Sequence, residues 1–308
     1  MQARPLVDVA VSVYGKPYQT AVTLLSLMRY SGQWIDKIYI TEERKQPNGS
    51  DLTLLHQLLR DYNTVYFTPR FFLWYEDITK SYKRHLLSLP AFRHAVRYQY
   101  AWEKTDKSYL LLTHNDVLYR DDIVGAYLER IGDAVGIGKV GQCWNCPAYK
   151  AQKCWGGMYD QYQPDYAEIE QLYQTYGNVR KTPFQKIICA DHSWPLPECR
   201  LNEFTALINM PLARRVTMPY GPAYPLGITD GVDTGTKWFR QISEMGLRAT
   251  NFEYDPYAQH GWASAVSSGH QSLFDKSMYD AEEERAYQVL QNEYGLGTPA
   301  LAYGKTVS

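Results

Sequence analysis

The fold is decided by the stretch Ser108-Tyr109-Leu110-Leu111-Leu112-Thr113-His114-Asn115-Asp116. Its apolar run predicts a strand that is buried on both sheet faces, as in the parallel sheets of α/β proteins. Three polar side chains, His114, Asn115 and Asp116, follow directly where this strand ends. Because open α/β sheets bind ligands beyond the carboxyl ends of their strands, the stretch predicts a site at this point.

The segments around this strand alternate between strand and helix patterns. Residues 6–13 alternate β-branched with small or polar side chains and run into the turn Tyr14-Gly15-Lys16-Pro17. Strand, helix and strand in succession predict a parallel sheet. We expect strands over 6–13, 36–41, 64–67, 108–113 and 248–254, and helices around Ala21–Met28 and over 54–59, 81–103 with a break near Pro90, 120–131, 166–176, 202–215, 236–245 and 275–294, with His260 in a loop.

Length and composition exclude several classes of protein. The chain has 308 residues, of which 45% are hydrophobic and 21% charged, the composition of a globule with a full core. The 32 basic and 33 acidic residues nearly cancel, which argues against a protein that coats nucleic acid. No long uncharged apolar run occurs, so we expect no integral membrane segment and a cytoplasmic protein, membrane-associated at most through its partners.

The pattern divides the chain into three regions. Residues 1–132 carry the regular α/β alternation, and 133–200 loosen into a segment rich in Cys, Trp and Tyr. Residues 201–308 resume helical patterns. We expect an α/β half, an insertion and a further half that ends in a C-terminal helix. The aromatic residues of the insertion are open to two interpretations, an acceptor platform or a hydrophobic cluster beneath a long loop.

This order of parts resembles the GT-A fold of nucleotide-sugar glycosyltransferases, in particular the family 2 group, over residues 6–131 and 227–262. The resemblance implies a Rossmann-like mixed, mostly parallel sheet flanked by helices, and a nucleotide diphosphate sugar as donor. It makes residues 1–132 the nucleotide-sugar-binding half and residues 201–308 the acceptor-side half. It also implies donor-binding roles for residues that match the family's positions. These are Val13, Tyr14 and Gly15 after the first strand, Glu42 and Glu43 after the second, Arg97 on the helix before the fourth, and His114 and Asn115 after it.

The same resemblance implies a divalent cation, Mn²⁺ or Mg²⁺. His114-Asn115-Asp116 stands where the family has its Asp-x-Asp motif, with His114 in place of the first Asp, and His260 matches a late metal-binding histidine. Asp116 and His260 are then the metal ligands, and the cation neutralises the charge of the diphosphate leaving group. Taken alone, Asp116 also fits a turn or helix-cap residue, and His260 a loop hydrogen-bonder.

The loop around Asp230-Gly231-Val232-Asp233 looks like the family's acceptor-side carboxylate. An inverting transferase needs a carboxylate that takes the acceptor's hydroxyl proton, and Asp233 is the first choice with Asp230 in reserve. The resemblance implies hexosyl or deoxyhexosyl transfer to a glycan or lipid-linked acceptor in polysaccharide biosynthesis. A non-catalytic carbohydrate- or nucleotide-binding module on the same scaffold is the alternative.

Five cysteines lie in the insertion. Cys143-x2-Cys146 has the spacing of a zinc knuckle, with Cys154 and Cys199 as further ligands of a structural Zn²⁺ site. We expect Cys189 to be packed in an apolar run instead. The other interpretation is a set of reduced, partly buried thiols, since a cytoplasmic setting disfavours disulfides.

Overall fold

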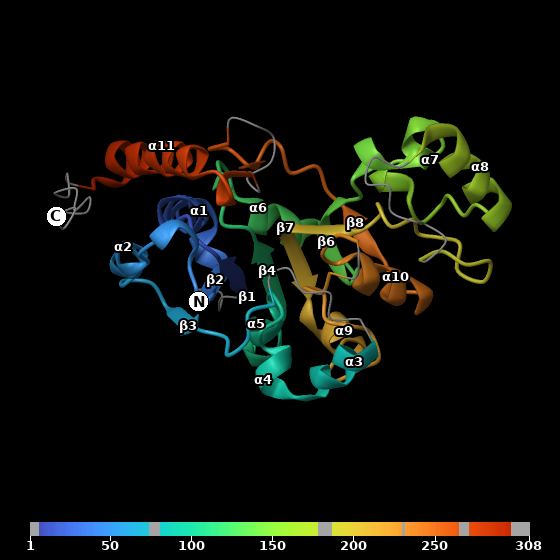
Figure 1. Cartoon of the computed structure of the whole chain (residues 1–308), viewed down its shortest axis with the longest axis horizontal. Coiled ribbons are helices and arrows are strands. Elements are labelled where there is room, and N and C mark those ends of the chain that lie inside the picture. Colours follow the sequence, from blue (N-terminus) through green and yellow to red (C-terminus); the bar gives the residue numbers. More distant parts are fainter. Residues whose placement is uncertain (1–5, 74–80, 178–186, 230–231, 265–270, 297–308) are drawn as a thin grey trace.

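The computed structural model describes residues 6–73, 81–177, 187–229, 232–264 and 271–296. Within them, seven strands form one sheet in the order β3-β2-β1-β4-β7-β6-β8 (Figure 1). Strands β1 to β4 run parallel to one another, whereas β7 runs antiparallel to both of its neighbours. The strands of the main sheet are β1 (Val7–Val13), β2 (Ile35–Glu42), β3 (Thr64–Phe67), β4 (Tyr109–Thr113), β6 (Gly136–Val140), β7 (Leu201–Asn209) and β8 (Ala249–Asn251).

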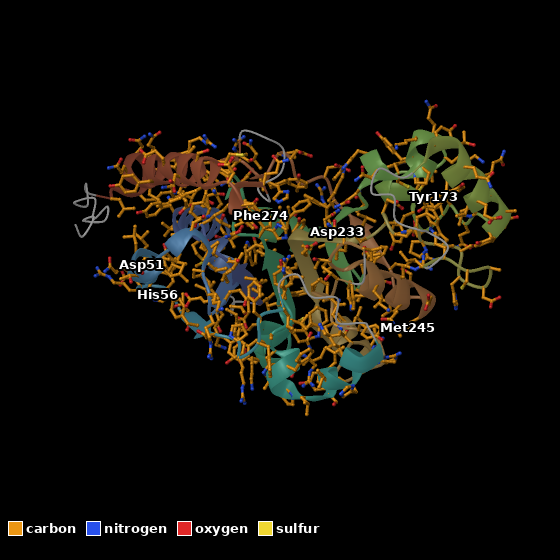
Figure 2. All side chains as sticks on the ribbon, viewed as in Figure 1. Asp51, His56, Tyr173, Asp233, Met245 and Phe274 are labelled. Carbon is orange, nitrogen blue, oxygen red and sulfur yellow. The ribbon has the colours of Figure 1, made fainter. Side chains whose placement is uncertain are left out.

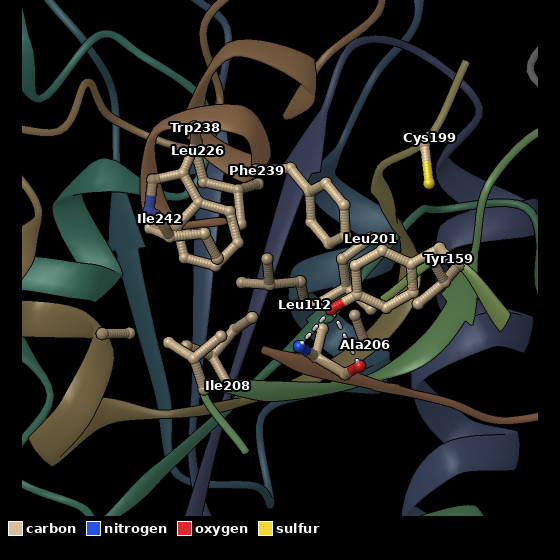
Figure 3. Packing of buried hydrophobic residues seen from close by; sticks show 14 of the residues in the cluster. Leu112, Tyr159, Cys199, Leu201, Ala206, Ile208, Leu226, Trp238, Phe239 and Ile242 are labelled. Atoms are coloured by element: carbon tan, nitrogen blue, oxygen red, sulfur yellow. Dashed lines mark hydrogen bonds between the residues drawn. The ribbon is translucent and has the colours of Figure 1, made fainter. Parts of the chain in front are cut away.

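Helices cover both faces of this sheet. On one face, α1, α6 and α11 pack against the valine side chains at positions 7, 9, 11 and 13 of β1. On the other face, α5, α9 and α10 pack against β4 and β7. Figure 3 shows Trp238, Phe239 and Ile242 of α10 close to Leu112 and Ala206 of the sheet. The helices are α1 (Pro17–Ser31), α2 (Thr53–Leu58), α3 (Ser81–Arg84), α4 (Pro90–Arg93), α5 (Gln99–Lys104), α6 (Ile123–Arg130), α7 (Pro147–Lys150), α8 (Tyr166–Tyr176), α9 (Met210–Val216), α10 (Thr236–Glu244) and α11 (Lys276–Tyr294).

The α/β class predicted from the sequence, a mixed and mostly parallel sheet flanked by helices, is confirmed. The strands expected over 6–13, 36–41, 64–67 and 108–113 become β1 to β4. In β1, alternate side chains enter opposite cores: Val9 and Val11 join one cluster and Ala10 the other. This two-sided burial is what the apolar patterns of β1 and β4 indicated.

One expected helix was wrong. Residues 202–215 form strand β7 followed by the short helix α9, and β7 lies in the middle of the sheet. Buried polar side chains interrupt the apolar pattern that would indicate a strand, and these side chains form hydrogen bonds to other segments of the chain. Asn202, for example, donates from Nδ2 to the carbonyl oxygens of Lys139 at 2.9 Å and Gly141 at 3.1 Å. The expected long helix over 81–103 is also interrupted, forming α3, α4 and α5.

A second, two-stranded sheet positions the candidate site. β5 (Val117–Tyr119) pairs antiparallel with β9 (Ala258–His260), and Val117 lies opposite His260. His260 is therefore the last residue of a strand, whereas the sequence analysis expected it in a loop. Because β5 follows Asp116 directly, the pairing brings two parts of the chain together that are far apart in sequence.

The main sheet draws strands from each of the three regions that the sequence pattern divides, including β6 from residues 133–200. The division at 132 and 200 stays a prediction about domain organisation. Helices α7 and α8 of the middle region lie at the opposite end of the molecule from α2 and β3 (Figure 1). None of the helices among the described residues combines the length and hydropathy that crossing a membrane requires.

Candidate active site

Three side chains meet beyond the carboxyl end of β4. His260 Nε2 lies 3.4 Å from Asp116 Oδ1, and His114 Nδ1 lies 3.8 Å from the same oxygen. One ligand atom from each residue can be chosen such that all lie within 4.8 Å of one another, a spacing that suits a metal ion. The β5–β9 pairing holds this group together, since the Gly261 N–H also donates to the Asp116 carbonyl oxygen at 2.9 Å. We call His114, Asp116 and His260 the cation cluster.

The Asp116 carboxylate is the centre of the cation cluster. Its Oδ1 is buried and has no hydrogen-bond partner among the described residues, although two imidazole rings face it. Burial alone would raise the pKa of Asp116, but the neighbouring histidines, His260 above all, hold it well below its usual value. Burial likewise opposes the charged form of His260, and the Asp116 carboxylate nevertheless raises the pKa of that ring. An ionised buried carboxylate between two imidazoles offers the mixed O/N donor set that Mn²⁺ accepts.

Strand β7 supports both histidines. The Phe204 ring stacks on His260 with centroids 4.4 Å apart and planes at 9°. Glu203 Oε1 lies 3.4 Å from His114 Nε2. The sequence analysis identified neither contact because it placed Glu203 and Phe204 on a helix. On a helix these residues would not lie beside the end of β4.

The expected donor-binding residues after β1 and β4 lie together. Asn115 Nδ2 donates to the Gly15 carbonyl oxygen at 3.4 Å, and the Gly15 N–H donates to Gln46 Oε1 at 2.6 Å. Gly15 has a φ of +74°, a conformation that favours glycine. Val13, buried at the end of β1, accepts from the Glu43 N–H at 3.1 Å, so the first two strands end side by side.

The other residues expected to bind the donor form two groups. Glu43 and Arg97 interact with each other, whereas Glu42 and Tyr14 each contact a different residue. Glu43 is buried with its Oε2 lacking a hydrogen-bond partner among the described residues, and its carboxylate interacts with the charge of Arg97. Burial raises the pKa of Glu43 to about 7, although the guanidinium opposes the rise. Glu42 instead pairs with His56 of α2 at 2.5 Å, and Tyr14 packs its ring against Phe72 at 5.4 Å.

Helix α11 contributes a contact that the sequence did not indicate. The Lys16 ammonium donates to Glu282 Oε2 at 2.7 Å, and both side chains are buried. The Tyr279 hydroxyl accepts from the Lys16 N–H at 2.6 Å. The turn after β1 is therefore held by residues more than 250 positions away, which no local pattern can reveal.

Asp233 is joined to the cation cluster through β7. Its Oδ2 accepts from Gln142 Nε2 at 2.8 Å and from Arg200 Nη2 at 3.1 Å. Arg200 also pairs through Nη1 with Glu203, the residue that faces His114. Burial opposes the ionised form, yet the Arg200 guanidinium keeps the pKa of Glu203 well below its usual value. Figure 2 places Asp233 near the middle of the molecule, and Asp230 lies outside the described residues.

The four cysteines proposed as zinc ligands line one small cavity, together with Glu198 and Trp194. Three of the four are buried, and Cys143 is half-buried. Cys189, expected to be packed, is instead exposed. Of the aromatic residues in the same segment, Tyr159 is buried, whereas Trp144 and Trp155 are exposed.

No family model matches the chain, and no curated protein matches it. Several solved structures do match the chain. The mannosyltransferase PcManGT from Pyrobaculum calidifontis in complex with GDP-Man and Mn²⁺ is 12% identical, with 96% of this chain and 77% of that chain covered and a TM-score of 0.46. Glucosyl-3-phosphoglycerate synthase from Mycobacterium tuberculosis, in complex with Mn²⁺, UDP-glucose and phosphoglyceric acid, is 9% identical, with 96% and 82% covered and a TM-score of 0.43.

Core-mannan synthase A from Aspergillus fumigatus, in its Mn/GDP form, is 10% identical, with 84% of this chain and 75% of that chain covered and a TM-score of 0.42. These TM-scores lie below 0.5 and the identities are low, so the resemblance to GT-A nucleotide-sugar glycosyltransferases stays a prediction. The mixed, mostly parallel sheet that the resemblance implies is present.

Proposed function

We propose that this chain is a metal-dependent inverting glycosyltransferase that moves a hexosyl or deoxyhexosyl group from a nucleotide diphosphate donor to a hydroxyl acceptor. One observation carries the proposal. Asp116 Oδ1 is buried beyond the end of β4, faces two imidazole rings, and has no hydrogen-bond partner among the described residues. A buried carboxylate oxygen that interacts with two imidazoles but forms no hydrogen bond is a position that a bound cation would complete.

The residues present fit a divalent cation. Asp116 and His260 would hold it, with His114 as a third ligand or as a donor to the diphosphate. A cation bound here would stabilise the negative charge that develops on the diphosphate as the glycosidic bond breaks. Mn²⁺ suits the two nitrogen donors better than Mg²⁺ does.

The donor would lie across the ends of β1, β2 and β4. Asn115 and Gly15 are already in contact there, so the backbone of the β1 turn and the end of β4 form one surface. Glu43 has a free carboxylate oxygen for a ribose or base donor group, and Arg97 is close enough to influence its charge. These contacts support the nucleotide-binding roles that the family resemblance implies.

Asp233 would act as the general base. As the acceptor oxygen attacks the anomeric carbon, its proton passes to the Asp233 carboxylate, and the bond from that carbon to the diphosphate oxygen breaks. Gln142 and Arg200 fix the orientation of the carboxylate, and 27% of its side chain stays exposed and within reach of an acceptor. A glycan or lipid-linked acceptor, a place in polysaccharide biosynthesis and a cytoplasmic location belong to the same proposal.

Nucleotide binding tests the cation cluster. We expect UDP, GDP or dTDP to bind more tightly with Mn²⁺ than without it in isothermal titration calorimetry. Asp116→Asn should abolish this enhancement because an amide is a poor metal ligand, whereas the exposed Asp133→Asn should retain it. A nucleotide affinity that is unaffected by Mn²⁺ in the unaltered protein would contradict the metal-dependent mechanism.

Turnover separates the transferase from a binding module. A panel of nucleotide sugars screened for hydrolysis and transfer with Mn²⁺ should identify the donor. Asp233→Asn should lower turnover by about 10²–10⁴-fold, the usual contribution of a general base, and leave nucleotide affinity within a few-fold. Full turnover in that variant removes Asp233 from the mechanism, and metal-independent sugar binding without turnover favours the module.

A further inference from the structure

The cavity lined by Cys143, Cys146, Cys154 and Cys199, here called the cysteine cavity, lies apart from the cation cluster. Its thiols come from three separate turns of the chain: the 3-10 turn before α7, the loop after α7, and the turn before β7. Cys146, Cys154 and Cys199 expose 6–8% of their surface. Figure 3 shows Cys199 beside Tyr159 at the edge of the core.

The lining of the cysteine cavity suits a metal ion that prefers sulfur. Apart from the four cysteines and Glu198, the residues that line the cavity are glycine and aromatic residues. A thiolate is the form of cysteine that binds metals, and a bound ion displaces the thiol proton. The four thiols are therefore the donors that a soft or borderline metal ion would bind in this cavity.

We propose that the cysteine cavity is a structural zinc site in which the four thiolates bind one Zn²⁺ ion. A tetrahedral site of four cysteines, opened by a C-x2-C pair, is a common structural zinc arrangement with Zn–S distances of about 2.3 Å. Among the described residues no three of these sulfurs lie within 4.8 Å of one another, so binding requires the cysteine side chains to rotate toward a common centre.

The position of the cysteine cavity gives the ion a role. Gln142 and Arg200, which orient Asp233, are the chain neighbours of Cys143 and Cys199. Their backbones are joined, since the Gly141 N–H donates to the Arg200 carbonyl oxygen at 2.7 Å and the Gln142 N–H to that of Glu198 at 2.8 Å. An ion that links the two segments would fix both partners of Asp233. This positioning role rests on the proposed function, whereas the zinc site does not.

Metal content tests the zinc site directly. The whole chain, purified under reducing conditions and supplied with Zn²⁺, should contain about one zinc per chain by elemental analysis. Cys154→Ser and Cys199→Ser should lose most of it. The exposed Cys189→Ser is the matched control and should retain it, as should His260→Ala, which removes a ligand of the cation cluster. No zinc in the unaltered protein, or full zinc in the two cavity variants, overturns the proposal.

A spectroscopic measurement covers the outcome in which the cysteine variants fail to fold. Co²⁺ added to the zinc-free unaltered protein should give the intense visible absorption of tetrahedral cobalt bound to thiolates, and Zn²⁺ should abolish it. Absence of that spectrum also overturns the zinc site. For the positioning role, folded Cys154→Ser should lose turnover while Mn²⁺-enhanced nucleotide binding stays within a few-fold. If the unaltered protein transfers no sugar, the proposed function fails and the zinc measurements still stand.

Discussion

Replacing Glu43 with glutamine is expected to stabilise the protein at pH 8 and to leave its stability unchanged near pH 4. The Glu43 side chain is buried, 4% of the residue is exposed, and burial raises its pKa from the usual 4.5 to about 7 against the opposing charge of Arg97. In the unfolded chain the carboxyl ionises around its usual pKa. Between the two values the folded state binds more protons than the unfolded state, so the free energy of unfolding decreases as the pH rises through this window.

The magnitude follows from the two pKa values. One pKa unit corresponds to 1.36 kcal/mol, and the difference between 4.5 and about 7 corresponds to about 3 kcal/mol lost once the pH exceeds 7. Glutamine has nearly the same shape and does not ionise, so Glu43→Gln should recover most of this amount at pH 8. The glutamine amide still needs a hydrogen-bond partner, which makes about 2 kcal/mol a reasonable expectation.

Urea unfolding at a series of pH values between 4 and 8 measures this effect. The difference in free energy between Glu43→Gln and the unaltered protein should grow from near zero at pH 4 to its full value above pH 7. Glu129→Gln at the exposed end of α6 is the control and should change the free energy of unfolding by less than about 0.5 kcal/mol at every pH. A difference that is independent of pH, or a destabilised variant at pH 8, would refute the assignment of Glu43 as a buried carboxyl with a raised pKa.

Three further substitutions test other parts of the structure. Gly15→Ala should cost about 1–3 kcal/mol in urea unfolding, because φ is +74° and the new Cβ would lie 2.6 Å from a neighbouring proline ring; unchanged stability would contradict this turn. Lys16→Met should cost about 3–5 kcal/mol by leaving Glu282 buried without its cation, and adding Glu282→Gln should recover part of the loss; purely additive losses would argue against the pair. Phe204→Leu should weaken Mn²⁺-enhanced nucleotide binding about tenfold in calorimetry by releasing His260, and an unchanged enhancement would show that the stacked ring is dispensable.

The sequence allowed the prediction of those features whose signal is local. The leucine run of β4 and the polar residues after it indicated both a central strand and the edge where a site would form, and Asp116 and His260 do meet there. The C-x2-C spacing likewise indicated a shared site, and the four cysteines line one cavity. The strand with its polar end and the C-x2-C pair each lie in one short stretch, whereas the meeting of Asp116 with His260, which are far apart in the chain, was expected only from the family resemblance.

The features that the sequence did not reveal depend on tertiary partners. β7 was taken for a helix because Asn202, Glu203 and Thr205 interrupt its apolar pattern. In the folded chain the Asn202 amide nitrogen and the Glu203 carboxylate bond to groups outside the strand. The same error concealed Glu203 as the neighbour of His114. Pairs such as Lys16 with Glu282 join distant segments and leave no periodic signal.

Charged residues on β7 and directly before it connect Asp233 to the cation cluster. Arg200 pairs with both Glu203 and Asp233, and Glu203 in turn faces His114 of the cation cluster. The carboxylates of Asp116, Glu203 and Asp233 lie in a network with one guanidinium, and Asp116 raises the pKa of the His260 ring beside it. Positive charge next to Asp116 is therefore stabilising. Under the proposed function a divalent cation held by Asp116 and His260 would supply that charge in place of the proton on the imidazole.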